Sequence, residues 1–328
     1  RKHTALGRFK HEGAKVTIAP DGRLAVYMGD NQRSESIYKF VSKNRYQPGN
    51  RAANMRLLEE GTLYVARFNE NGSGDWLALV HGQNGLTAAN GFADQGEVLV
   101  KTRMAADLVG ATKMDRPEWI TADPFTAGSI YCTLTNNSQR GEAGKPAADA
   151  ANPRANNLFG HIIHWQEADG DGTKLSFKWD ILVLAGNKQA AKPEHKGNIN
   201  GDDFGSPDGL AFDNRGVLWI QTDVSTSTLN MKEYAGMGNN QMVATVLGSN
   251  EYRRFLTAPN GSEVTGIAFT PDNKTMFINI QHPGEPSKGD SDPARPTAVS
   301  TWPDGAAAGR PRAATVVITK NDGGVNGS

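Results

Sequence analysis

The sequence predicts an all-β fold and, within that class, a β-propeller. Glycine occurs 37 times and proline 16 times among the 328 residues, and they separate many short apolar runs rich in β-branched and aromatic side chains. Such runs are typical of strands joined by tight turns. One hairpin pattern also recurs along the chain with long, irregular spacers, as it does in propeller blades.

The recurring pattern is an apolar strand, a turn that combines an acidic residue or proline with glycine or asparagine, and a second strand. It occurs in four segments: Ala14–Asp30, Glu118–Asn137, Asp208–Asp223 and Thr265–His282. We expect each segment to open one blade, because the first strands of a propeller's blades line its central channel. Residues 1–328 would then form a single propeller domain of about four blades.

The segments between the repeats have simpler patterns. We expect outer strands at Ser36–Ser42 and Thr62–Phe68, and short helices at Met55–Glu60 and Met104–Val109, the second ended by Gly110. Three stretches rich in proline, alanine and glycine are expected to be long loops: Gly141–Asn157, Asn187–Gly205 and Gly284–Arg310.

Composition excludes several classes of protein. The 35 basic and 35 acidic residues cancel, so we expect no nucleic-acid binding. No apolar run approaches the roughly 18 to 20 residues that a membrane-spanning helix needs. Cys132 is the only cysteine, which excludes an internal disulfide, and we expect it to be a packed core thiol.

The stretch Met114–Ile120 contains the first candidate for chemistry. Pro117 has no backbone N–H for a sheet and favours extended backbone, so a strand is expected to begin there. Side chains at i and i+2 of a strand share a face, and Arg116 and Glu118 should therefore point together toward a channel or cleft. An ordinary Arg–Glu ion pair at a strand edge is the alternative interpretation.

Carboxylates recur where the repeats begin. Glu12 precedes the first repeat, Glu118 opens the second, Asp208 opens the third, and Glu263 lies two residues before the fourth. If blades converge on one axis, these acids would form a ring of hard oxygen ligands suited to Ca²⁺, Mg²⁺ or oxidised iron. Acids that only cap turns at blade edges would give the same pattern.

Several uncommon motifs follow one another along the whole chain: His11–Ala14, Tyr27–Asp30, Leu57–Phe68, Met114–Trp119, Thr133–Asn137, Ser206–Gly209, Ile280–Glu285 and Ala314–Lys320. In this order they resemble the PhoX family of secreted bacterial alkaline phosphatases. The resemblance implies a six-bladed propeller that is exported by the twin-arginine route to the periplasm or the medium. It also implies a cofactor of two Fe³⁺ ions and Ca²⁺ ions joined through an oxo bridge.

Residue by residue, the resemblance makes Glu12 and Glu118 metal-bridging ligands and makes Asp208 and Asp30 calcium ligands. Arg116 would hold the phosphoryl group, since its planar donor fork fits two phosphoryl oxygens. The implied reaction is hydrolysis of small phosphate monoesters to inorganic phosphate by a metal-activated oxygen, with the protein acting as a monomer.

The chain departs from the family in one respect. The upstream portion that supplies an iron-binding cysteine and further acid and amide ligands is missing, so we expect this chain to be the C-terminal part of a longer protein. Two other functions fit the same residues: a calcium-dependent propeller that hydrolyses sugar lactones or esters, and a non-catalytic propeller that binds protein partners. The hydrolase has no special need for Arg116, and in the binding propeller the ring of acids would be a coincidence of the surface.

Overall fold

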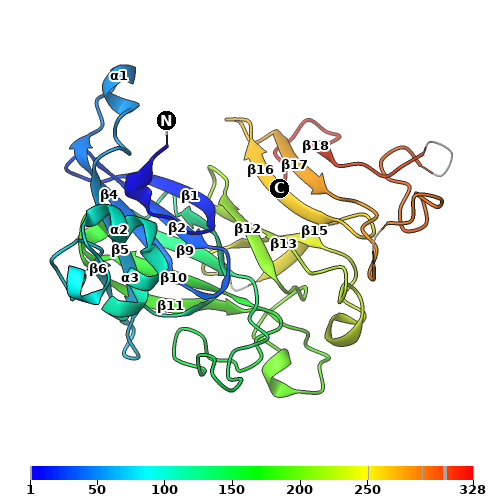
Figure 1. Cartoon of the computed structure of the whole chain (residues 1–328). Helices are drawn as coiled ribbons and strands as arrows, with labels where there is room; N and C mark the ends of the chain where they lie inside the picture. Colours follow the sequence, from blue (N-terminus) through cyan, green and yellow to red (C-terminus); the bar gives the residue numbers. More distant parts are fainter. Residues whose placement is uncertain (1, 250, 290, 306–308, 328) are drawn as a thin grey trace. The chain divides into compact units, whose positions relative to one another are not determined.

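The structure, a computed structural model, describes residues 2–249, 251–289, 291–305 and 309–327 (Figure 1). The chain divides into two compact units. The first comprises Arg1–Asn157 and Ile162–Leu182, and the second comprises Leu158–His161 and Val183–Ser328. Each unit has its own hydrophobic core, and the two are described separately below.

The predicted all-β fold is confirmed in both units. The first contains a nine-stranded antiparallel sheet in the order β1-β2-β4-β5-β6-β11-β10-β9-β8, apart from the ends of β10 and β11, which fall in the second unit. Its strands are β1 His11–Ile18, β2 Arg23–Asp30, β4 Ile37–Arg45, β5 Gly61–Phe68, β6 Ser73–Ala78, β8 Pro117–Ala122, β9 Ser129–Leu134, β10 His161–Glu167 and β11 Ser176–Leu184. A separate pair is formed by β3 Arg33–Glu35 and β7 Met114–Asp115.

This nine-stranded sheet consists of two meanders, one that begins at β1 and one that begins at β8. They are joined through their last strands, where Ser176–Lys178 of β11 pairs with Ser73–Asp75 of β6. The strands at the two ends of the sheet, β1 and β8, lie side by side, so that the sheet nearly closes on itself. The starts of two repeated hairpins therefore become neighbours.

The second unit contains two smaller antiparallel sheets, of four and three strands. The four-stranded sheet is a meander of β12 Pro207–Phe212, β13 Val217–Thr222, β14 Gln241–Val246 and β15 Tyr252–Thr257. The three-stranded sheet contains β16 Glu263–Phe269, β17 Thr275–Gln281 and β18 Ala314–Thr319. Four-stranded antiparallel meanders are the units of propeller blades.

All four predicted repeats form antiparallel hairpins: β1–β2, β8–β9, β12–β13 and β16–β17. Each hairpin begins a meander, as the blade interpretation expects. In β17 the alternation is clear, since Met276, Ile278 and Ile280 are buried while the residues between them are exposed. That residues 1–328 form one propeller domain stays a prediction.

Two helices, α2 Gln95–Val100 and α3 Thr102–Val109, cover one face of the first unit's sheet (Figure 1). Val98, Ala105 and Ala106 pack into the core cluster that contains residues of β2, β4 and β5. As predicted, α3 ends at Gly110, which adopts φ 81° in the left-handed region that glycine favours. The remaining short helices are α1 Arg51–Asn54 and the 3₁₀ turns Thr4–Leu6, Ala88–Asn90, Ala168–Gly170, Pro193–His195 and Lys232–Tyr234.

The helix expected at Met55–Glu60 is wrong. The structure instead has α1 at Arg51–Asn54, and residues 55–60 form turns. Asn50 caps α1, because its side chain accepts a hydrogen bond from the N–H of Ala53 at 3.1 Å. The cap starts the helix four residues earlier than the apolar residues suggested, and β5 follows too soon for a second helix.

Other local expectations are confirmed. The outer strands predicted at Ser36–Ser42 and Thr62–Phe68 are β4 and β5. No regular strand occurs in the described parts of the three predicted loops, of which positions 290 and 306–308 lie outside the described residues. Cys132 is fully buried in the core of the first unit, and burial raises the pKa of its thiol.

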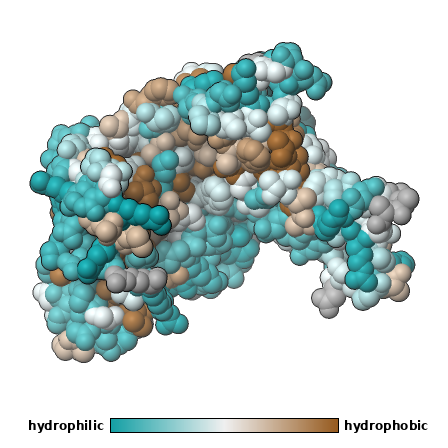
Figure 2. Space-filling view, turned by 90° about the horizontal axis from the view of Figure 1, so that it is seen from above, coloured by the Kyte–Doolittle hydropathy of each residue, from teal (hydrophilic) through white to brown (hydrophobic). Residues whose placement is uncertain are grey.

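None of the helices in the described part of the chain has the length and apolar character that a bilayer span requires. Hydrophilic residues cover most of the face seen in Figure 2, and hydrophobic residues gather there in smaller patches.

The core of the first unit encloses an ion pair. Lys39 and Glu167 have fully buried side chains, with the ammonium nitrogen 3.1 Å from a carboxylate oxygen of Glu167. The indole N–H groups of Trp76 and Trp165 donate to the same carboxylate at 3.0 and 3.2 Å. Burial lowers the pKa of Lys39 to about 8, although Glu167 opposes this shift, and burial raises the pKa of Glu167.

This pair predicts a pH dependence of stability. An unfolded lysine keeps its proton up to a pKa near 10.5, so between pH 8 and 10.5 the unfolded chain binds more protons at Lys39 than the native one. The contribution of Lys39 to the free energy of unfolding therefore rises with pH across this window, by at most about 1.4 kcal/mol per pH unit. We expect the double variant Lys39→Met/Glu167→Gln to lose this positive slope relative to the wild type in urea unfolding from pH 7.5 to 10.5. If the free energies of unfolding of the two proteins change with pH in parallel, Lys39 does not titrate as a buried group.

Candidate active site

The first strand of every repeated hairpin carries one extra residue. In each pair the register shifts by one near the start of that strand, which is the mark of a β-bulge. The shifts lie between Glu12 and Lys15, Pro117 and Ile120, Pro207 and Leu210, and Thr265 and Ile267. Bulges redirect side chains. Three of them contain or adjoin Glu12, Glu118 and Asp208, and the fourth begins two residues after Glu263.

Glu118 and Asp208 occupy the same position within their bulges, directly after a proline that begins the strand. The residues before these prolines, Arg116 and Ser206, have φ values of 63° and 52°. Left-handed backbone costs free energy in residues other than glycine, and such strained residues cluster at functional sites. The two hairpins therefore share one local conformation, in which a strained residue, a proline and an acid follow one another.

Arg116 and Glu118 meet as predicted. The Nε of Arg116 lies 2.9 Å from a carboxylate oxygen of Glu118, whose side chain is 1% exposed while that of Arg116 is 26% exposed. The pair is thus more than a solvated surface ion pair. The two side chains do not meet through the regular alternation of a strand, which the sequence predicted. They meet because Arg116 precedes β8 in left-handed backbone and Glu118 lies in the bulge.

Glu12 is tied to this pair through Asn31, which follows β2. The side-chain carbonyl of Asn31 accepts a hydrogen bond from Nε of Arg116 at 2.9 Å, and its NH₂ donates to Glu12 at 3.2 Å. We call Glu12, Asn31, Arg116 and Glu118 the Arg116 cluster.

The strand β1 approaches β8 very closely beside this cluster. A Cβ on Gly13 would lie 3.3 Å from the Cα of Trp119, and one on Gly29 would lie 2.6 Å from the carbonyl oxygen of Glu118. Gly13 also has φ 64°, which favours glycine. The close contact at Gly29 and the contact and φ at Gly13 explain why glycines stand where the hairpin β1–β2 meets the start of β8. This contact places Glu12 next to the bulge that contains Glu118.

Asp30, the last residue of β2, is fully buried and bound by Arg103 of α3. The Nε and Nη2 of Arg103 donate to the two carboxylate oxygens at 2.7 and 2.5 Å, a bidentate geometry that raises the pKa of Arg103 further. The N–H of Lys10 donates to the same carboxylate at 3.1 Å. The role of Asp30 as a calcium ligand stays a prediction, and it would require Asp30 to release Arg103.

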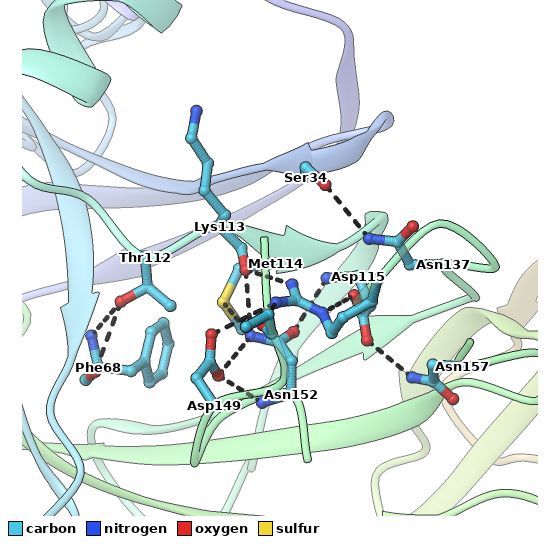
Figure 3. A network of polar contacts seen from close by, with 12 residues as sticks. Ser34, Phe68, Thr112, Lys113, Met114, Asp115, Asn137, Asp149, Asn152 and Asn157 are labelled. Carbon is cyan, nitrogen blue, oxygen red and sulfur yellow. Dashed lines mark hydrogen bonds and ion pairs between the residues drawn. The ribbon is translucent and has the colours of Figure 1, made fainter. Parts of the chain in front are cut away.

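The backbone that carries Arg116 is held by a buried network (Figure 3). Asp115 accepts from Nε of Arg140 at 2.5 Å and from the amide of Asn157 at 2.8 Å, and the side chains of Asp115 and Arg140 are fully buried. Arg140 also donates to the carbonyl of Lys113 at 2.5 Å. The predicted loop Gly141–Asn157 is therefore fastened to the strand that leads into Arg116.

In the second unit, three carboxylates come together. One oxygen from each of Asp208, Asp223 and Glu263 lies within 4.8 Å of the other two. Asp223 reaches Asp208 because its N–H donates to the carbonyl of Ser206 at 3.0 Å, across the start of the hairpin β12–β13. We call these residues the carboxylate cluster.

This donor set fits a hard cation. Carboxylate oxygens are the ligands that Ca²⁺ prefers, and three acids this close repel one another without a counter-charge. Neighbouring side chains orient Glu263: the amide of Gln281 donates to it at 2.9 Å, and the ring of His282 lies 3.6 Å away.

Comparison with known proteins then identifies the family. The family model described as "Alkaline phosphatase PhoX" matches residues 1–284. The chain belongs to the PhoX family. A solved structure of Pseudomonas fluorescens PhoX in complex with vanadate, a transition state analogue, is 48% identical with a TM-score of 0.90. The match covers 99% of this chain and 56% of that chain, so this chain spans little more than half of its PhoX relative.

Two further solved structures have low similarity. Kuenenia stuttgartiensis hydrazine synthase is 12% identical, with a TM-score of 0.31 over 81% of this chain and 55% of that chain. A luciferin-regenerating enzyme is 13% identical, with a TM-score of 0.29 over 84% of this chain and 85% of that chain. Scores this low carry no argument here. Comparison with curated proteins gives no match.

For this PhoX chain, the structure brings Glu12, Arg116 and Glu118 together in the first unit and places Asp208 with two other acids in the second. The predicted convergence of all these acids on one axis stays a prediction. Sequence reasoning missed Asn31 and Asp223 as members of the clusters. Both follow the second strand of a repeated hairpin, where antiparallel pairing brings them back to the start of the first strand, and this was the available signal.

The buried Asp115–Arg140 pair predicts a large stability effect. Arg140→Met leaves the carboxylate of Asp115 buried without its cation, so we expect a loss of about 3 to 5 kcal/mol in the free energy of unfolding. The matched control is Arg67→Met, which breaks an ion pair with Asp75 whose side chains are 45% and 38% exposed. It should cost only about 0 to 1 kcal/mol. Chemical denaturation measures both, and equal losses would show that the Arg140 network contributes no more than a surface pair.

Proposed function

We propose that this chain carries the phosphate-binding and metal-binding part of a phosphomonoesterase that releases inorganic phosphate. The observation that carries the proposal is the Arg116–Glu118 pair: a partly exposed guanidinium fixed to a buried carboxylate in a chain of the PhoX family. The vanadate bound by the Pseudomonas relative, an analogue of the phosphoryl transition state, supports an oxyanion as the ligand.

Arg116 would bind and orient the phosphoryl group. A guanidinium presents a planar set of donors that suits two phosphoryl oxygens, and its charge stabilises the negative charge of the transition state. Its Nε is already held by Glu118 and Asn31, so little side-chain freedom would be lost when the anion binds. No side-chain nucleophile is needed in this arrangement.

The two clusters would hold the metal ions. We propose that Glu12 and Glu118 are ligands of Fe³⁺ and that Asp208, with Asp223 and Glu263, binds Ca²⁺, since all of these side chains offer hard oxygen donors. When bound, the cations would act as Lewis acids on the phosphoryl group. The substrates would be small phosphomonoesters, and the protein a monomer exported through the twin-arginine route to the periplasm or medium.

A calcium-dependent hydrolase of lactones or esters would also use the carboxylate cluster. It would have no particular use for Arg116. A guanidinium is matched to phosphate or carboxylate, whereas a lactone or ester is neutral. The geometry of the Arg116 cluster therefore favours the phosphatase, and hydrolysis of a phosphomonoester compared with a lactone distinguishes the two.

The role of Arg116 predicts a specific loss of activity. In the purified protein loaded with metal, Arg116→Ala should lower kcat/KM for a phosphomonoester such as p-nitrophenyl phosphate by about 100- to 1,000-fold, the effect typical of removing one transition-state donor. Vanadate binding should weaken in parallel. The control is Arg67→Ala, which removes an arginine from an exposed pair and should leave kcat/KM unchanged. An active Arg116→Ala protein would refute the proposed role.

The carboxylate cluster predicts calcium binding. Calcium at about 100 times its dissociation constant should raise the free energy of unfolding by about 2.7 kcal/mol, because only the native protein assembles the site. Asp208→Asn should reduce this stabilisation and the calcium found by elemental analysis. Asp272→Asn, a change of the same kind at an exposed turn of β16–β17, should alter neither. Equal calcium contents in both variants would place the cation elsewhere.

A further inference from the structure

We infer that Asn31 is a positioning residue, which fixes the guanidinium of Arg116 for an oxyanion and couples it to Glu12. The inference deepens the proposed function and rests on it for the identity of the ligand. Asn31, Arg116 and Glu12 all lie in the first unit.

The backbone places Asn31 at the start of the hairpin. Its N–H donates to the carbonyl of Lys10 at 2.9 Å, just as the N–H of Thr135 donates to Arg116 and that of Asp223 to Ser206. Asn31, Thr135 and Asp223 therefore occupy equivalent positions in three of the repeated hairpins. In the second unit, Asp223 at this position contributes an oxygen to the carboxylate cluster beside Asp208. In the first unit, Asn31 at the same position reaches Arg116, the residue before β8.

The amide of Asn31 satisfies both of its neighbours. Arg116 offers an N–H donor and needs an acceptor, whereas the carboxylate of Glu12 is an acceptor and needs a donor. An aspartate at this position would repel Glu12, and an aliphatic residue would serve neither neighbour. The two contacts also fix which end of the amide faces which residue, because the flipped amide would oppose like groups on both sides.

These contacts restrict the direction of the guanidinium. The N–H at Nε of Arg116 donates to the amide oxygen of Asn31 at 2.9 Å, and Nε lies 2.9 Å from Glu118 in an ion pair, so the hydrogen bond to Asn31 orients the group and the ion pair holds it near Glu118. The left-handed backbone of Arg116 and the restricted backbone of Pro117 after it fix the direction of the Cα–Cβ bond of Arg116. Asn31 itself is secured by its neighbour Asp30, which Arg103 binds with two hydrogen bonds.

The test is a double-mutant cycle between Asn31→Ala and Arg116→Ala in the metal-loaded protein, read by the dissociation constant of vanadate in calorimetry and by kcat/KM. We expect Asn31→Ala alone to weaken vanadate binding and kcat/KM about tenfold, the usual effect of losing one hydrogen bond to a charged group. In the Arg116→Ala background the same change should have an effect of about twofold or less, because Asn31 acts through Arg116. A loss that persists in that background, or no loss in the wild-type background, would overturn the inference.

Asn69→Ala is the matched control. The amide of Asn69 donates to Asp75 at 3.1 Å, and Arg67 pairs with the same carboxylate, so an amide, an acid and an arginine are grouped there as well, at the surface. This variant should leave vanadate binding unchanged. If Asn31→Ala fails to fold, Asn31→Leu removes the same two hydrogen bonds while keeping the side-chain volume.

Crystal structures of the Asn31→Ala variant and the wild type test the positioning role directly, without activity. The guanidinium of Arg116 should leave its position in the variant while Glu118 stays in place, and an unmoved Arg116 would overturn the inference. If the wild type binds no vanadate but Arg116 moves in the variant, the proposed function fails and the positioning by Asn31 stands.

Discussion

The candidate site depends on one constraint, the extra residue in the first strand of each repeated hairpin. In a regular strand, successive side chains point to opposite faces of the sheet, and the direction of Glu118 would be set by this alternation. The bulge releases the acid from that alternation. Because the same device recurs at Asp208, a repeated backbone irregularity places acids at corresponding points of different hairpins.

The two clusters differ in how their charges are paired. In the Arg116 cluster, Asn31 donates a hydrogen bond to Glu12, and Arg116 forms an ion pair with Glu118. The carboxylate cluster brings three acids together, with the amide of Gln281 beside Glu263. The first arrangement suits an anion that joins an existing network, and the second suits a cation that offsets negative charge.

Buried polar networks give the Arg116 cluster its rigidity. Arg140 and Asp115 fasten a long loop to the strand before Arg116, and Arg103 fastens α3 to the end of β2 just before Asn31. Both side chains of the Asp115–Arg140 pair are fully buried, whereas in the Arg103–Asp30 pair only Asp30 is buried and Arg103 is 30% exposed. Losing the partner of a buried charge is far more costly than losing one at the surface. Residues with no contact to a phosphate can thereby determine the precision of the site.

The sequence by itself determined the local features. The four hairpins, the strand that begins at Pro117, the end of α3 at Gly110 and the burial of Cys132 follow from turn residues, proline chemistry and apolar patterning, and all are confirmed. The family was also evident from motifs read in order along the chain. The helix misplaced at Met55–Glu60 failed because a single cap, Asn50, outweighed the apolar residues that follow it.

Only the tertiary structure decided which side chains meet. For Asn31 and Asp223 the sequence offers only their position after the second strand of a repeated hairpin. Their partners are set by pairing with residues about 20 positions away and by contact between strands far apart in sequence. The bulge beside Arg116 likewise becomes visible only in the register of β8 and β9, and Arg116 before it has left-handed backbone. Local sequence fixes what a residue can offer chemically, whereas strand register and long-range packing fix the partner to which it is offered.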